Sequence, residues 1–274
     1  EETTVLIVLS THHDNPYLTM AQRASIEELK VTDPDKYLQL GQARFIRPSN
    51  TYFHEFKKEI HVIDPFVIPD GWYRYTATDY GLDMEATLWI AVDYEGNGYV
   101  YKESYKPNLI ISAACQEIIR INDGDTIQMQ YGPPDLHATQ KTNGKTTWEM
   151  FSENNWPLWE TNNKRDVGAL AVKEWIKPYT SMDQDGNKIR TSRLKFFKTC
   201  ENIIRTLPQL LTDDKDANKY ATEPHELTHA PDALRYFCVM RECVPGVDLD
   251  KKTTAQHFFN RKPDDNSSLA GDFY

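Results

Sequence analysis

The sequence has few features of a secreted, membrane or zinc-ribbon protein. Its 274 residues include only four cysteines, none of them in a Cys-x-x-Cys pair, which is the spacing typical of zinc and redox sites. The longest aliphatic run, residues 5–9, is far shorter than the roughly 20 apolar residues that a membrane helix needs. Glu1 and Glu2 stand where a signal peptide would have basic residues. We therefore expect reduced thiols, no export signal and no membrane segment.

Positive charge is also in short supply. The chain has 31 Lys and Arg residues against 41 Asp and Glu residues, so its formal net charge is −10. This balance argues against a protein that binds nucleic acid through its whole surface, because neutralising phosphates requires clustered Lys and Arg. One region differs, since residues 141–205 carry a net charge of +4. The sequence therefore leaves room for a local nucleic-acid contact there.

Aromatic residues make up 12% of the chain, which supplies bulky material for a core. From Trp72 onward, alternating patterns predict three antiparallel strands, with a strong hairpin signal at residues 95–98. Helical and strand patterns then alternate. This order indicates an α/β fold with a mixed central sheet, three antiparallel strands followed by parallel strands, flanked by helices. The strands are expected at 72–79, 86–93, 99–105, 126–130, 157–159 and 193–197, and the helices at 108–121, 147–154, 166–177, 200–211 and 231–244.

The chain divides into three parts by pattern. Residues 1–69 contain a short expected strand at 5–9, a helix at 20–30, a second short helix after residue 34 and a connecting segment without sustained periodicity at 41–69. Residues 70–244 form the predicted α/β domain. Residues 245–274 are expected to be a poorly ordered tail.

Three aspartates end separate elements of the predicted domain. Asp79 lies at the end of an aromatic-rich strand, where an isolated buried carboxylate costs several kcal/mol unless it is paired or binds a cation. Asp135 follows the fourth strand, and Asp232 lies in the first turn of the last helix. Carboxylates that converge in this way can hold two Mg²⁺ or Mn²⁺ ions for phosphodiester hydrolysis. The simpler interpretation is that Asp79 begins a turn, Asp135 ends one, and Asp232 interacts favourably with the dipole of its helix.

Four further residues near these aspartates have two interpretations each. The turn after the first strand would bring Asp83 back toward the first carboxylate, but Asp83 also fits an exposed hairpin position. His229 precedes the last helix and would reach a phosphate or a metal-bound water, or form part of the helix cap. Lys164 and Arg165 would contact the DNA backbone, or remain solvated surface charges.

Two other motifs carry less weight. The adjacent histidines His12 and His13 have no further Cys or His at ligand spacing nearby, so the sequence does not predict a metal site there. Residues 143–147 imitate the end of a phosphate-binding loop, but Thr139 stands where the loop needs its first glycine, and no strand leads into it. We therefore expect no ATPase site in this chain.

The segment His225–Tyr236, taken with Thr78–Gly81 and Gly132–Asp135, resembles the nuclease domain of the large terminase subunits of tailed bacteriophages. The string His-x-x-Asp-Ala-Leu-Arg-Tyr within that segment is the most specific part. The resemblance covers roughly residues 70–244. Residues 14–43 also resemble the end of the terminase motor portion and its linker into the nuclease.

The resemblance implies an RNase H-like domain in which Asp79, Asp135 and Asp232 hold two divalent ions, Mg²⁺ or Mn²⁺, and cut concatemeric viral DNA. It also implies double-stranded DNA, the terminase small subunit and the portal protein as partners, and the host cytoplasm as location. Two alternatives remain at this stage. One is an RNase H-like transposase or resolvase-type nuclease, and the other is a noncatalytic module that docks on portal or capsid protein.

Overall fold

The computed structural model describes residues 10–32, 37–44, 50–81, 83–139, 144–161, 165–246 and 248–249. The strand expected at 5–9, the start of the second short helix, Lys164 and the expected tail beyond residue 249 lie outside these residues.

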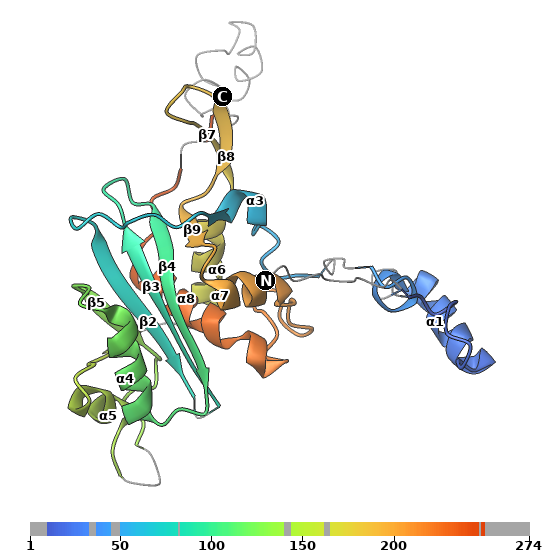
Figure 1. The fold of residues 1–274 in the computed structure, drawn as a ribbon, viewed down its shortest axis with the longest axis horizontal. Helices are drawn as coiled ribbons and strands as arrows, with labels where there is room; N and C mark the ends of the chain where they lie inside the picture. Colours follow the sequence, from blue (N-terminus) through green and yellow to red (C-terminus); the bar gives the residue numbers. More distant parts are fainter. Residues whose placement is uncertain are drawn as a thin grey trace, which may run out of the picture.

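A seven-stranded mixed sheet forms the centre of the fold, in the order β1-β9-β4-β3-β2-β5-β6 (Figure 1). Strands β2, β3 and β4 are antiparallel neighbours, while β5 pairs in parallel with β2, and β9 pairs in parallel with β4. The predicted α/β class with a mixed sheet is therefore confirmed. The strands are β1 (Val62–Ile63), β2 (Tyr73–Tyr80), β3 (Met84–Val92), β4 (Gly98–Pro107), β5 (Met129–Gly132), β6 (Trp159–Glu160) and β9 (Leu194–Phe197), and a separate hairpin contains β7 (Tyr179–Met182) and β8 (Lys188–Thr191).

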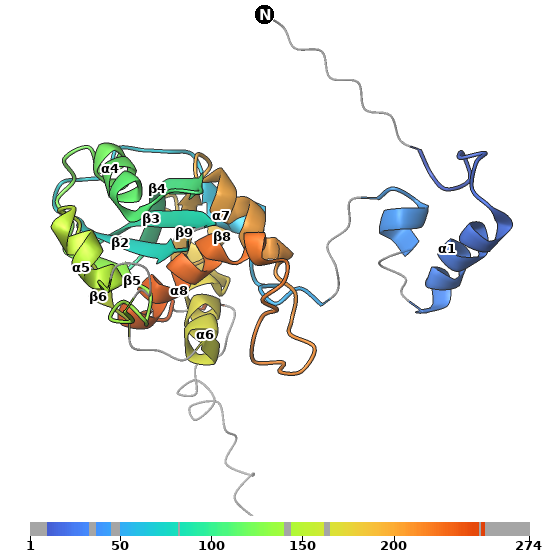
Figure 2. The ribbon, with the colours of Figure 1, turned by 90° about the horizontal axis from the view of Figure 1, so that it is seen from below.

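Helices cover both faces of this sheet (Figures 1 and 2). On one face, Trp89 Nε1 in β3 donates a hydrogen bond of 3.0 Å to Asn122 Oδ1 in α4. On the other face, α8 packs its Phe237 ring 5.7 Å from the ring of Tyr75 in β2. Because both faces are covered, β3 is buried along almost its whole length. The helices are α4 (Ile111–Asn122) and α5 (Thr147–Glu153) on the first face, and α6 (Arg165–Ile176), α7 (Glu201–Thr206) and α8 (His229–Met240) on the second.

The helix ends follow local sequence signals. Helix α7 stops before Pro208, and the chain continues as the 3₁₀ turn η2 (Leu207–Gln209), because proline removes a helical hydrogen bond. Helix α8 begins two residues earlier than the expected Pro231, directly after the 3₁₀ turn η3 (His225–Leu227). Pro231 is tolerated in this first turn, where backbone N–H groups have no helical partner. None of the helices described is long and apolar enough to cross a membrane.

The segment expected only to connect, residues 41–69, contributes to the core. Tyr52, Phe53 and Phe56 in this segment are at most 2% exposed. The short helix α3 (Lys58–His61) follows, and the buried His61 donates from Nε2 to the carbonyl of Ile176 in α6 at 2.7 Å. These aromatic residues have no strand or helix period, so the sequence pattern missed their burial.

Helix α1 (Met20–Thr32) and the π-helical turn η1 (Tyr37–Gly41) pack against each other. The expected helix at 20–30 is thus confirmed. Both views draw this pair away from the sheet (Figures 1 and 2).

Glu85, in β3, has a buried carboxyl group on the face of the sheet opposite that of Asp79. Glu85 has no exposed surface, and its carboxylate accepts hydrogen bonds from Thr87 Oγ1 at 2.5 Å and Ser104 Oγ at 2.6 Å. The Thr87 hydroxyl also bonds that of Thr78, at 2.9 Å. Burial raises the pKa of Glu85 to about 7, although the two hydroxyl hydrogen bonds oppose the shift.

We expect Glu85→Gln to flatten the dependence of stability on pH. Because the folded-state pKa of Glu85 is raised, its contribution is fully present below the unfolded pKa and is lost as pH rises through about 7. A shift of this size corresponds to about 3 kcal/mol. Urea unfolding between pH 5 and pH 8 should show the wild type losing stability relative to Glu85→Gln, with the exposed Glu95→Gln as control. Parallel pH profiles for all three proteins would contradict this.

Candidate active site

Asp79, near the end of β2, is held by two donors from α8. Its Oδ1 accepts a hydrogen bond from the Tyr236 hydroxyl at 2.9 Å, and its Oδ2 pairs with His229 Nδ1 at 3.0 Å. The Asp79 side chain is 17% exposed. The carboxylate predicted to need a partner therefore has two, and both come from the helix that carries Asp232.

One face of α8 presents the site residues to the sheet. His229, Asp232 and Tyr236 follow a spacing of three and four residues, which places them on the same side of a helix. Tyr236 was not predicted to have a role, although this spacing is visible in the sequence. Arg235 was also missed, and it lies three residues after Asp232.

Asp232 is surrounded by positively charged and hydroxyl donors. Its Oδ1 accepts hydrogen bonds from the Tyr220 hydroxyl and from Arg235 Nε, the latter at 2.9 Å. Its Oδ2 accepts one from Arg165, at the start of α6, at 3.2 Å. The Arg165 guanidinium also lies over the Tyr220 ring, 4.6 Å from its centroid. Tyr220 belongs to the loop before η3, and no sequence signal marked it.

Asp83 is linked to Asp79 through a histidine. His229 Nε2 lies 3.2 Å from Asp83 Oδ2, and His225 Nδ1 lies 3.0 Å from the same oxygen. Asp83, His225 and His229 together present ligand atoms within 4.8 Å of one another, a group that could hold a metal ion. Because both nitrogens of His229 face carboxylates, its doubly protonated form satisfies both contacts. Asp83 thus comes back toward Asp79, and its role as a ligand stays a prediction.

Burial and nearby charges shift the pKa values of Asp79 and His229. Burial raises the pKa of Asp79, and the charge of Asp232 adds to this, while the hydrogen bonds from His229 and Tyr236 oppose it. Burial alone would lower the pKa of His229, but the hydrogen bond and charge of Asp79, together with Asp83, raise it. Neighbouring carboxylates of this kind favour a bound cation.

Asp135 lies in the turn after β5, at the same end of the parallel strands as Asp79. Strands β2 and β5 are parallel, with Ala77 opposite Tyr131, so their carboxyl ends lie together. Asp135 follows β5 in an exposed turn, where its carbonyl accepts a hydrogen bond from Ala138 N at 2.9 Å. Among the residues placed by the structure, the hydrogen bonds around Asp79 and Asp232 do not include the Asp135 side chain. Its role as a third acid remains a prediction.

The two central carboxylates keep room for a hard cation. A carboxylate offers about four lone-pair positions. The hydrogen bonds given above use two of these on Asp79 and three on Asp232. Oxygen ligands that keep open positions beside a second carboxylate suit Mg²⁺ and Mn²⁺, which also retain water and substrate phosphate.

The mixed sheet and its flanking helices form a fold that is also found in the nuclease domain of a phage large terminase. By sequence, no protein-family model and no curated protein matches the chain. By structure, it is similar to the nuclease domain of the P22 large terminase, with a TM-score of 0.54 and 18% identity over 73% of this chain and 96% of that one. The resemblance in the sequence is therefore confirmed at the level of the fold.

A second similar structure is the large terminase of a thermophilic bacteriophage in complex with ADP. Its TM-score is 0.54 and its identity 14%, over 83% of this chain and 53% of that one. The chain therefore spans about half the length of that thermophilic phage protein.

Proposed function

We propose that this chain is the metal-dependent endonuclease part of a phage terminase large subunit, which cuts concatemeric viral DNA during packaging. The observation that carries the proposal is that the carboxylates of Asp79 and Asp232 lie close enough to interact electrostatically. They come from β2 and α8, and the charge of Asp232 raises the pKa of Asp79. The terminase-nuclease fold supports the same function.

Two divalent ions, Mg²⁺ or Mn²⁺, are the proposed cofactors. Asp79 and Asp232 would hold them, with Asp135 and Asp83 as further proposed ligands at the same edge. When bound, two such ions activate a water and stabilise the leaving oxygen of a phosphodiester. The donor set fits this group because it consists of carboxylate oxygens, the ligands that hard divalent ions prefer.

The protein's own side chains orient the two central carboxylates. Tyr236 and His229 each donate to a different oxygen of Asp79, which fixes the plane of that carboxylate. Tyr220 and Arg235 both donate to Oδ1 of Asp232, which holds that carboxylate in one orientation. Such supporting contacts keep ligands in their binding geometry and prevent rotation away from the ions.

Arg165, at the start of α6 and beside Asp232, is the proposed DNA contact. Its side chain is 29% exposed, and one terminal nitrogen donates to Asp232. A guanidinium has five donors in a fork that suits phosphate oxygens, so the exposed part of Arg165 would bind the backbone beside the cleaved bond. His229 would remain protonated and bridge the carboxylates of Asp79 and Asp83. It would not contact DNA directly. Double-stranded DNA, the terminase small subunit and the portal protein are the proposed partners, in the host cytoplasm.

A plasmid-cleavage assay tests this function. We expect slow, ATP-independent nicking and linearisation of supercoiled DNA in Mn²⁺ or Mg²⁺, and no cleavage in EDTA. Because phosphate contacts are screened, cleavage should fall sharply at roughly a few hundred millimolar salt. Supercoiled plasmid left intact with both metals at low salt would instead favour the noncatalytic docking module.

A further inference from the structure

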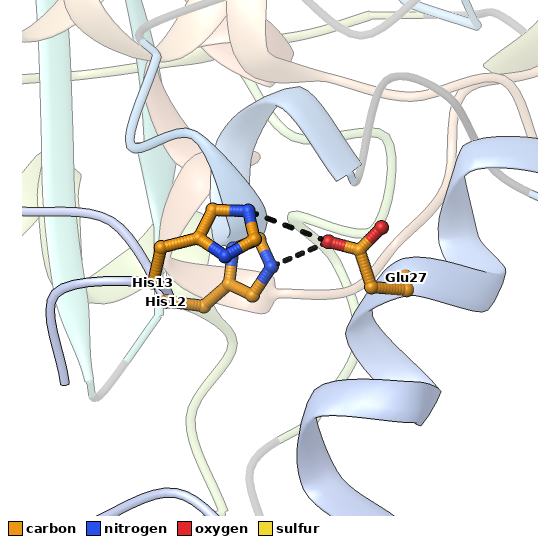
Figure 3. Close-up of side chains that lie close together, drawn as sticks. All are labelled: His12, His13 and Glu27. Carbon is orange, nitrogen blue, oxygen red and sulfur yellow. Dashed lines mark hydrogen bonds and ion pairs between the residues drawn. The ribbon is translucent and has the colours of Figure 1, made fainter. Parts of the chain in front are cut away.

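A second group of potential metal ligands lies in the N-terminal segment, away from Asp79 and Asp232. His12 and His13 lie in the turn before α1, and Glu27 lies within α1 (Figure 3). The Nε2 atoms of both histidines face one oxygen of Glu27. His12 Nε2 is 2.7 Å and His13 Nε2 is 3.6 Å from Oε1. The three ligand atoms lie within 4.8 Å of one another.

The ring of His12 points one nitrogen at a carbonyl oxygen and the other at a carboxylate oxygen. His12 Nδ1 lies 2.7 Å from the carbonyl oxygen of Gly41, which can only accept a hydrogen bond, so Nδ1 carries a proton. In the neutral ring, Nε2 then carries a lone pair and acts as an acceptor. This nitrogen faces the carboxylate oxygen of Glu27. Two acceptors at this distance repel each other unless a positive charge lies between them. A proton supplies that charge for His12 and Glu27, whereas a metal ion would also engage His13 Nε2, which lies 3.6 Å from the same oxygen.

We propose that His12, His13 and Glu27 bind a divalent ion of the zinc type. Two imidazole nitrogens and one carboxylate oxygen form a ligand set that zinc accepts, with water in the fourth position. Ligands about 2.0 Å from a tetrahedral ion lie roughly 3.3 Å apart, which falls between the two separations from Oε1, 2.7 and 3.6 Å. The separations of both histidines from Glu27 are therefore close to those that a tetrahedral ion requires.

The surroundings of His12 are those of a metal-binding histidine. Metal-ligating histidines usually donate their second ring N–H to a carbonyl or carboxylate, which fixes the tautomer. Gly41 supplies that acceptor at the end of η1. The His12 side chain is 2% exposed and packs edge-on to the Tyr37 ring, 6.1 Å between centroids. This ligand is therefore held in place before any ion arrives.

The remaining ligands give the ion access from solvent. The side chains of His13 and Glu27 are 65% and 35% exposed. Lys30 pairs with the other oxygen of Glu27, Oε2, so Oε1 is the atom left to coordinate. The bound ion would join the turn at residues 11–14 to α1, and through the Gly41 carbonyl to η1. The sequence did not predict this site because Glu27 is far along the chain and becomes a neighbour only through the fold.

Zinc binding by the whole chain tests the proposal. Equilibrium dialysis of metal-stripped protein against Zn²⁺, with thiols kept reduced, should show one equivalent that His13→Ala and Glu27→Gln lose or bind at least about tenfold more weakly. His225→Ala is the matched control, because it removes an exposed histidine from the other possible metal group and should keep this equivalent. Co²⁺ in place of Zn²⁺ should give visible absorption bands that the same two variants lose.

Two outcomes would overturn the proposal. One is a wild-type protein that binds no zinc attributable to His13 or Glu27, with identical isotherms for wild type, His13→Ala and Glu27→Gln. The other is loss of the equivalent in His225→Ala alone, which would assign the ion to the site near Asp83. Either result would leave His12 and Glu27 as a proton-bridged pair.

Discussion

Replacing Asp79 by Asn should reduce metal-dependent cleavage of plasmid DNA by more than about a hundredfold. The change removes a negative charge at the proposed ion site without changing side-chain volume. Loss of a supporting contact at a metal site typically costs 10–100-fold, so loss of a direct ligand should cost at least as much. Asp232→Asn should behave alike. The measurement is the initial rate of nicking in saturating Mn²⁺.

The controls separate loss of chemistry from loss of fold. Asp70→Asn changes a fully exposed aspartate in the loop before β2 and should cleave like the wild type. The thermal unfolding midpoint of Asp79→Asn should be at least as high as that of the wild type without metal, because burial and the charge of Asp232 disfavour the ionised form. Undiminished nicking by both Asp79→Asn and Asp232→Asn would refute the proposed site.

Removing the guanidinium beside Asp232 should have the second large effect, on stability. Arg235 and Asp232 have side chains only 6% and 13% exposed, and they are joined at 2.9 Å. Breaking a buried pair by deleting one partner costs about 3–5 kcal/mol, because the other charge stays buried. We expect Arg235→Met to lose stability of this order in urea unfolding.

A double-mutant cycle distinguishes the ion pair from packing. If the cost of Arg235→Met arises from a carboxylate left with only Arg165 and Tyr220 as partners, then adding Asp232→Asn should recover a substantial part of it. The double variant would then be more stable than the sum of the single changes predicts. Strict additivity would show that Arg235 stabilises α8 through its packed side chain alone.

The parts of the fold with a regular period were predictable from the sequence. The alternation in β2 and β3 and the turn at residues 95–98 indicated the antiparallel strands, and the apolar spacing in α4 indicated its bounds within a few residues. The aromatic residues of 50–69 were missed because they fill gaps between elements and follow no period. Such residues become core only when distant elements meet, as His61 does with α6.

The site was predictable where chemistry and position coincided. Asp79 and Asp232 stood out because each ends or begins an element, and the structure brings them to one place. Tyr236 and Arg235 were within reach of helical spacing from Asp232, although neither was predicted. Tyr220 approaches Asp232 from an irregular loop, and no local pattern specifies such a contact.

The measurement that bears most directly on the proposed function is the position of Mn²⁺ in crystals of this chain soaked with the ion and a DNA analogue. Anomalous scattering should show two ions, with Asp79 and Asp232 among their ligands and the analogue's phosphate beside them. Absence of any peak at these two carboxylates at saturating Mn²⁺ would contradict the proposed active site. A single ion there would contradict two-metal hydrolysis.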